Sequence, residues 1–250
     1  MINKSRGIYL FNLMGFRVSA DWSWLIVAVL MTISLGSGYY SAVFGSDPSL
    51  GTFAFGLIST LMLFFSVLLH EVGHSVVARA NGIRIIGIRL FIFGGVAQMD
   101  REPQSPGVEF KVTIAGPAVS AALAVFFYLL SDSILSATSP AIRGVTQLLA
   151  QANLIMVIFN MIPGFPMDGG RILRSIVWKL RGNYLGATRI ATRTGKIVAF
   201  GFMGLGALIA LSGQTIDGIW LAFIGAFLYN AAQSSYMYAQ YSESQGRGAG

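Results

Sequence analysis

The sequence predicts an all-α polytopic membrane protein with about six transmembrane helices and a small membrane-associated β region between the second and third spans. Apolar residues make up 54% of the 250 residues, and charged residues only 11%. Several separate apolar runs approach the roughly 20 residues that a helix needs to cross a bilayer. Basic residues are concentrated between these runs, as in the loops of membrane proteins.

Composition also excludes several classes of function. The chain contains no cysteine, so disulfides, thiolate catalysis and cysteine metal ligands are excluded. The net charge of +7 lies in loops rather than in a basic domain, so we expect no nucleic-acid partner. Residues 1–20 lack the continuous apolar core and cleavage site of a signal peptide, and we expect the first span to be retained.

The first two spans have clear ends. Trp22 and Trp24 begin the first apolar run, and Tyr39 and Tyr40 end it, which is the aromatic placement expected at the two membrane interfaces. The second span ends before Asn81-Gly82, a helix-stop signal. The six expected spans cover about residues 22–40, 52–80, 112–130, 145–161, 197–211 and 218–236.

A β region follows the second span. Residues 83–99 are rich in β-branched and aromatic side chains, which favours one or two strands broken at Gly94-Gly95. Near the start of the chain, residues 15–18 fit either a short strand or an interfacial segment.

The later spans differ in character. The third carries small residues at four-residue spacing (Gly116, Ser120, Ala124), which suits close helix packing. The fourth ends in residues 160–170, whose prolines and glycines cannot continue a regular helix. A basic amphipathic segment follows at residues 171–180, and the fifth span is rich in glycine.

Charge distribution predicts the orientation. Basic residues gather at 79–111 and 171–196, whereas the loops at 41–51 and 212–217 contain none. Six spans with both termini in the cytoplasm satisfy this bias.

His70-Glu71-Val72-Gly73-His74 is an H-E-x-x-H motif, and it contains the chain's only two histidines. Residues four apart lie on one face of a helix, so both imidazoles can reach one metal ion. Ordinary polar residues in a helix bundle are the alternative, but three ionisable groups inside a span are costly without a metal or a water cavity. The motif lies in the half of the second span nearer Arg79, which the orientation places in the cytoplasmic half of the bilayer.

Glu71 lies about 100° around the helix from His70, so it can face a water at the metal without being a ligand. Alternatively, its carboxylate accepts a hydrogen bond from one histidine.

A catalytic zinc needs a third protein ligand. Of the acidic residues outside the motif, only Asp168 lies beside an apolar span in an irregular, glycine-rich segment, and elimination favours it. Asp168 could instead be the N-cap of the helix that follows.

The H-E-x-x-H motif, together with Asn160-x-x-Pro163-x-x-Pro166-x-Asp168-Gly169, resembles the signature motifs of the site-2 protease family of intramembrane zinc metalloproteases. The resemblance implies one zinc ion per chain, with His70, His74 and Asp168 as ligands and Glu71 as the general base. It further implies that Asn160 positions substrate or stabilises the oxyanion. Gly94, Gly95 and Val96 would belong to a strand that binds unwound substrate.

The function implied is regulated intramembrane proteolysis, the hydrolysis of a peptide bond within or near a transmembrane segment. Substrates would be single-span membrane proteins such as an anti-sigma factor or a membrane-tethered regulator, in a bacterial or archaeal inner membrane. We expect residues 1–240 to form a single membrane protease domain and residues 241–250 a flexible tail. We also expect a minimal form of the family, with no inserted PDZ domain and with the CBS domains of some members absent or truncated.

Two other functions use the same residues. A divalent-metal transporter would use them as a transit site, but the chain has few other intramembrane acids to form a relay. A non-catalytic membrane scaffold would merely retain the motif.

Overall fold

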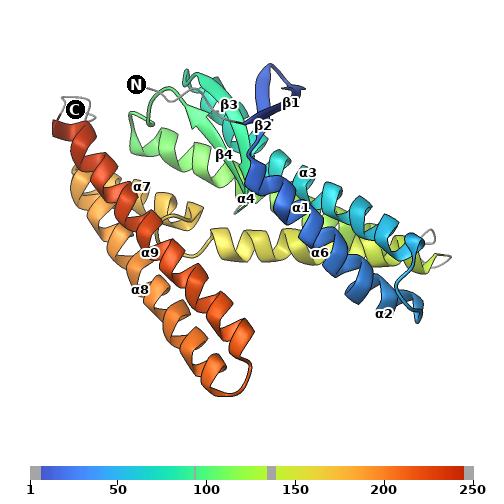
Figure 1. Ribbon diagram of the computed structural model, residues 1–250. Coiled ribbons are helices and arrows are strands. Elements are labelled where there is room, and N and C mark those ends of the chain that lie inside the picture. Colours follow the sequence, from blue (N-terminus) through green and yellow to red (C-terminus); the bar gives the residue numbers. More distant parts are fainter. Residues whose placement is uncertain (1–6, 93, 134–138, 245–250) are drawn as a thin grey trace. The chain divides into compact units, whose positions relative to one another are not determined.

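The computed structural model describes residues 7–92, 94–133 and 139–244 (Figure 1). Within these residues, six helical segments are long and apolar enough to cross a membrane. This agrees with the predicted fold class. The chain divides into two compact units: the first contains residues 1–102 and 115–157, and the second residues 103–114 and 158–250.

The first unit begins its helical part with α1 (Trp22–Ser34), which continues through a π-helical turn, η1 (Leu35–Tyr40), into α2 (Ser41–Phe44). Asp21 caps α1, because its side chain accepts a hydrogen bond from the Ser23 backbone N–H at 3.0 Å. Arg89 also forms an ion pair with Asp21, which links the start of this span to the sheet described below.

Helix α3 (Leu50–Ala80) carries the H-E-x-x-H motif and is 31 residues long. A capping box starts it: Ser49 and Thr52 each accept a hydrogen bond from the other's backbone N–H. The predicted stop is confirmed, since Asn81 is the C-cap and Gly82 adopts a φ of 78°, which an L side chain rarely adopts.

A four-stranded sheet of order β1-β2-β3-β4 also belongs to the first unit. Its strands are β1 (Ile8–Leu13), β2 (Phe16–Ala20), β3 (Ile85–Phe91) and β4 (Gly94–Met99). Strands β2 and β3 are parallel, whereas the two outer pairs are antiparallel. The predicted β region is therefore two strands. Residues 16–18, left open between strand and interfacial segment, are a strand, and the β1–β2 hairpin is an addition that the sequence did not predict.

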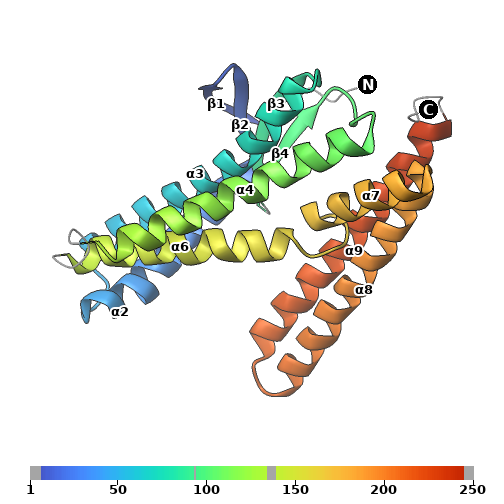
Figure 2. The ribbon, with the colours of Figure 1, turned by 180° about the vertical axis from the view of Figure 1, so that it is seen from behind.

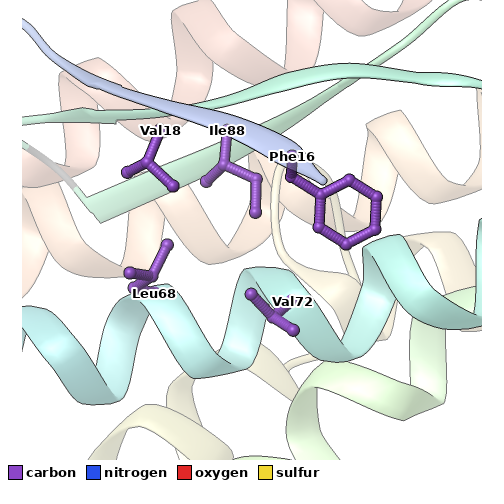
Figure 3. Packing of buried hydrophobic residues seen from close by; sticks show 5 residues of the cluster. All are labelled: Phe16, Val18, Leu68, Val72 and Ile88. Carbon is purple, nitrogen blue, oxygen red and sulfur yellow. The ribbon is translucent and has the colours of Figure 1, made fainter. Parts of the chain in front are cut away.

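One face of this sheet packs on the motif-bearing part of α3 (Figure 3). Phe16 and Val18 of β2 and Ile88 of β3 meet Leu68 and Val72 of the helix, and all five side chains are buried. Burial of such side chains contributes about 1.5–3 kcal/mol each relative to exposure in water. Because Leu68 lies just before the motif and Val72 lies within it, this packing fixes the sheet beside the glutamate of the motif.

Two further long helices are α4 (Pro106–Ser131) and α6 (Pro140–Asn160), whose residues 115–131 and 140–157 complete the first unit. Asn153 is fully buried on α6, and its Nδ2 donates to Ser66 Oγ on α3 at 3.2 Å. Such polar contacts stabilise helix pairs in a bilayer, where lipid offers no hydrogen-bond partner.

The second unit contains α7 (Asp168–Arg181), α8 (Tyr184–Leu211) and α9 (Thr215–Ser244). Figures 1 and 2 show α8 and α9 side by side along most of their length. Glycine permits this approach, because a Cβ on Gly206 would lie 2.6 Å from the Gly218 carbonyl oxygen. Helix α9 continues through Ser244, so residues 241–244 of the expected tail are helical.

A buried ion pair stabilises the second unit. Arg174 Nε, on α7, donates to Glu109 Oε1 at 2.7 Å, and the two side chains are only 6% and 1% exposed. Tyr184 adds a hydrogen bond from Arg174 Nη1 to its hydroxyl, at 2.8 Å. A buried charge is costly unless it is paired in this way.

The helix surfaces away from the core are strongly apolar. Ile155 on α6 is 64% exposed, and Ile197 and Leu208 on α8 are 69% and 66% exposed. A surface of this kind is suited to lipid rather than to water. Together with the six long apolar helices, it identifies an integral membrane protein.

Candidate metal centre

The two motif histidines converge on one point. His70 and His74 are buried on the same face of α3, and their Nε2 atoms are 3.1 Å apart. The helix produces this convergence, since residues four apart are separated by one turn. Both imidazoles therefore direct the same nitrogen to a shared position.

Ser120 on α4 orients His70. The Nδ1 of His70 lies 2.9 Å from Ser120 Oγ, and this Oγ donates to Met156 Sδ at 3.3 Å. Because this hydroxyl donates its own hydrogen to sulfur, its oxygen accepts a hydrogen bond from Nδ1–H of His70. Neutral His70 then has its lone pair on Nε2, where it can bind a metal. Histidine ligands are commonly oriented by such a hydrogen bond on the other ring nitrogen. The sequence suggested Ser120 only as a small packing residue.

Gly116, one turn before Ser120 on α4, leaves room for both rings. A Cβ at Gly116 would lie 2.3 Å from His74 Nε2 and 2.7 Å from His70 Nε2. Gly73 permits the close approach of the two helices, because a Cβ there would lie 2.9 Å from the Ala115 carbonyl oxygen. The predicted small-residue stripe thus leaves room for the histidine nitrogens themselves.

The geometry fits a zinc ion. Two nitrogens bound to one tetrahedral zinc at about 2.0–2.1 Å lie about 3.3–3.4 Å apart. The observed Nε2 separation of 3.1 Å is close to this value. Neutral imidazole is a preferred zinc ligand.

Glu71 lies against strand β4. Its Oε2 accepts a hydrogen bond from the Ala97 backbone N–H at 3.0 Å, and a Cβ at Gly95 would lie 2.6 Å from its Cγ. This bond joins Glu71 to the sheet through one of its two carboxylate oxygens. Of the three strand residues predicted to bind substrate, Gly95 is thus beside Glu71, Val96 is 43% exposed, and Gly94 adopts a φ of 129°.

Asp168 and Asn160 belong to the second unit. Asn160 is the last residue of α6 and is half-buried. Asp168 is the first residue of α7, and the N-cap is Met167, so Asp168 does not have the N-cap role that was its alternative. Gly169 and Gly170 pack on backbone atoms of residues 161–165, with Cβ positions 2.3–2.4 Å from them. This packing fixes the start of α7 within its unit.

A membrane-crossing helix with a buried histidine pair and a glutamate between them defines the chain as an integral membrane metalloprotein of the H-E-x-x-H type. The profile of peptidase family M50 matches residues 58–202. The chain belongs to this family.

Individual relatives are also named as zinc metalloproteases. Rip3 of Mycobacterium tuberculosis is 37% identical over 220 residues, which are 88% of this chain and 56% of Rip3. Zinc metalloprotease MJ0392 of Methanocaldococcus jannaschii is 34% identical over 231 residues, 90% of this chain and 59% of that protein. The chain thus spans somewhat more than half the length of these relatives.

A solved structure, the site-2 protease from Methanocaldococcus jannaschii, matches with a TM-score of 0.59 at 32% identity, covering 92% of this chain and 95% of the other. The resemblance stated from the motifs is therefore confirmed, as are the fold class and zinc as the cofactor. Neither the structure nor the metalloprotease relative is named as a transporter. The roles of individual site residues remain predictions.

Proposed function

We propose that this protein is an intramembrane zinc metalloprotease that hydrolyses a peptide bond within or near a transmembrane segment of another membrane protein. The observation that carries the proposal is the pair of converging imidazoles on a 31-residue apolar helix, with Glu71 beside them. Membership of peptidase family M50 supports the reaction class.

His70 and His74 hold the zinc through Nε2, and Asp168 is the third protein ligand. Neutral imidazoles and one carboxylate form a standard catalytic zinc set that leaves one coordination position open. The position of Asp168 at the start of α7, and the Met167 N-cap, support the ligand role. A bound zinc ion supplies Lewis acidity, which polarises the scissile carbonyl and acidifies a water.

Glu71 is the general base. Its carboxylate takes a proton from the attacking water and then delivers a proton to the leaving amine. Asn160 carries an amide side chain that can position substrate or donate to the oxyanion, a role that rests on the family motif. Ser120 keeps His70 in the tautomer that the site requires.

The substrate backbone pairs with β4 at Gly94–Val96. A transmembrane helix hides its carbonyls in its own hydrogen bonds, so the segment to be cut must unwind. Within the described residues, β4 is the outermost strand of the sheet. It pairs with β3 on one side, and its other side is an edge of the sheet. Addition of a strand to such an edge replaces the lost helical bonds.

Partners and placement follow from the same function. Single-span membrane proteins, such as an anti-sigma factor or a membrane-tethered regulator, are the proposed substrates, within a bacterial or archaeal inner membrane. Both termini are cytoplasmic and the site lies in the cytoplasmic half of the bilayer, as the loop charges favour. Residues 1–240 act as one protease domain.

The test uses purified protein in lipid nanodiscs with a single-span membrane substrate. Cleavage should stop after treatment with a zinc chelator and return when zinc is added back. Proteoliposomes containing the same protein should show no zinc flux. Zinc flux without peptide cleavage would contradict the protease function and favour the transporter function.

A further inference from the structure

The Glu71 side chain is held by two separate features of one strand. The Ala97 N–H donates to its Oε2 at 3.0 Å, while Gly95, two residues earlier on β4, leaves the space that its methylene and carboxyl carbons occupy. A Cβ at Gly95 would lie 2.6 Å from Cγ and 3.3 Å from Cδ. One strand therefore contacts both the polar and the apolar part of the side chain.

The register of the sheet explains why this N–H is available. Val96 pairs with Arg89, and Ala97 pairs with Ile88. In an antiparallel ladder, successive N–H groups point to opposite sides of the strand. The Ala97 N–H points away from β3 toward Glu71, which supplies its acceptor.

We propose that Gly95 and the backbone N–H of Ala97 position the Glu71 carboxylate, so that β4 orients the general base as well as pairing with substrate. This inference rests on the proposed protease function. Glutamate loses considerable rotamer freedom when it is fixed, and a charged hydrogen bond offsets that cost. With Oε2 held by Ala97, the other carboxylate oxygen is the one directed at water.

The same contact limits where substrate can pair. The Ala97 N–H already has Glu71 as its acceptor, so an added strand pairs with Gly95, whose N–H and C=O lie on the same side of β4 as the Ala97 N–H, and not with the Ala97 N–H itself. Base and substrate are then held by adjacent positions of one strand. A displacement of the strand would misplace both together.

A Gly95→Ala variant tests the positioning role. The added methyl group displaces Glu71 but leaves the backbone groups of β4 unchanged. The kcat for a single-span substrate should therefore fall, by about 10²-fold for a misplacement near 1 Å. KM should stay within about twofold, because ground-state binding is unaffected. Zinc content should equal that of the wild type.

Gly87→Ala is the matched control. Gly87 lies on β3, and its Cβ would press on the Arg17 carbonyl oxygen at 2.9 Å, away from Glu71. This variant strains the sheet without touching the base, and its kcat should stay near the wild-type value. An equal loss of kcat in both variants, or no loss in Gly95→Ala, would overturn the inference.

A second measurement does not depend on cleavage. In ¹⁵N-alanine-labelled protein, Glu71→Ala should speed hydrogen exchange of the Ala97 amide by about tenfold or more, because a bond to a charged group is lost. The Ala20 amide on the inner strand β2 should stay slow. Unchanged Ala97 exchange would refute the contact. If Glu71→Ala speeds Ala97 exchange but the wild-type protein cleaves no substrate, the contact stands and the proposed protease function is refuted.

Discussion

His70 Nδ1 lies 2.9 Å from Ser120 Oγ, a contact between helices α3 and α4 across 50 residues of sequence. Through this contact, a neutral hydroxyl determines which nitrogen of His70 faces the metal. Ser120 is fully buried. The zinc site therefore depends on a residue that is not itself a ligand.

Ser120→Ala should weaken zinc binding by about 10- to 100-fold, the usual effect of removing the group that orients a histidine ligand. Competition with a calibrated chelator measures this affinity. Ser131→Ala is the control on the same helix, since the Ser131 hydroxyl donates to the Tyr128 carbonyl and not to a histidine. Equal affinities of Ser120→Ala and the wild type would contradict the role of Ser120.

Gly116→Ala should also weaken zinc binding. The new methyl would lie within 2.7 Å of both histidine Nε2 atoms, so the rings must move from the metal position. We expect affinity to fall at least about tenfold, because ligand distances tolerate changes of only about 0.2 Å. Gly107→Ala, also on α4, adds a methyl that meets no atom within 4 Å and should bind zinc normally. Full zinc occupancy of Gly116→Ala would show that the rings lie elsewhere.

Asp168→Ala should lose both zinc and activity if Asp168 is the third ligand, since two histidines alone bind zinc weakly. Elemental analysis of the purified variant gives the zinc content. Asp217→Ala is the matched control, because Asp217 is likewise an acidic residue in the first turn of a helix. Zinc content at the wild-type level in Asp168→Ala would exclude it as a ligand.

The Asp21 carboxyl gives a pH dependence outside the membrane spans. Its pKa is lowered from the usual 3.8, first by the Ser23 backbone N–H and then by Arg89. The stability that this charge contributes is full above the unfolded-state pKa and is lost as pH falls through the lower folded-state pKa. Thermal unfolding should therefore show Asp21→Asn less stable than the wild type near about pH 6, and closer to it near about pH 3. A pH-independent difference would contradict this assignment.

The features that could be predicted from the sequence are those specified by neighbouring residues. The six spans follow from the length of apolar runs, and the histidine pair follows from the helical repeat, so both need only neighbouring residues. The stop at Asn81-Gly82 was predictable for the same reason.

The missed features all join distant segments. The parallel pairing of Val18 with Ile88 adds the N-terminal hairpin to the sheet, and no property of residues 8–20 specifies that partner. Likewise, Ser120 reads as a small packing residue until α4 is placed beside His70. The bond from Ala97 to Glu71 requires the sheet register, which depends on packing against α3.

The most direct test of the central claim is Glu71→Gln, with zinc content and cleavage of a single-span substrate measured on the same purified sample. Glutamine keeps the size of the side chain and can still accept the Ala97 N–H, but it cannot take a proton from water. We predict one zinc per chain, as in the wild type, and no detectable cleavage. Cleavage at the wild-type rate with zinc bound would contradict the account.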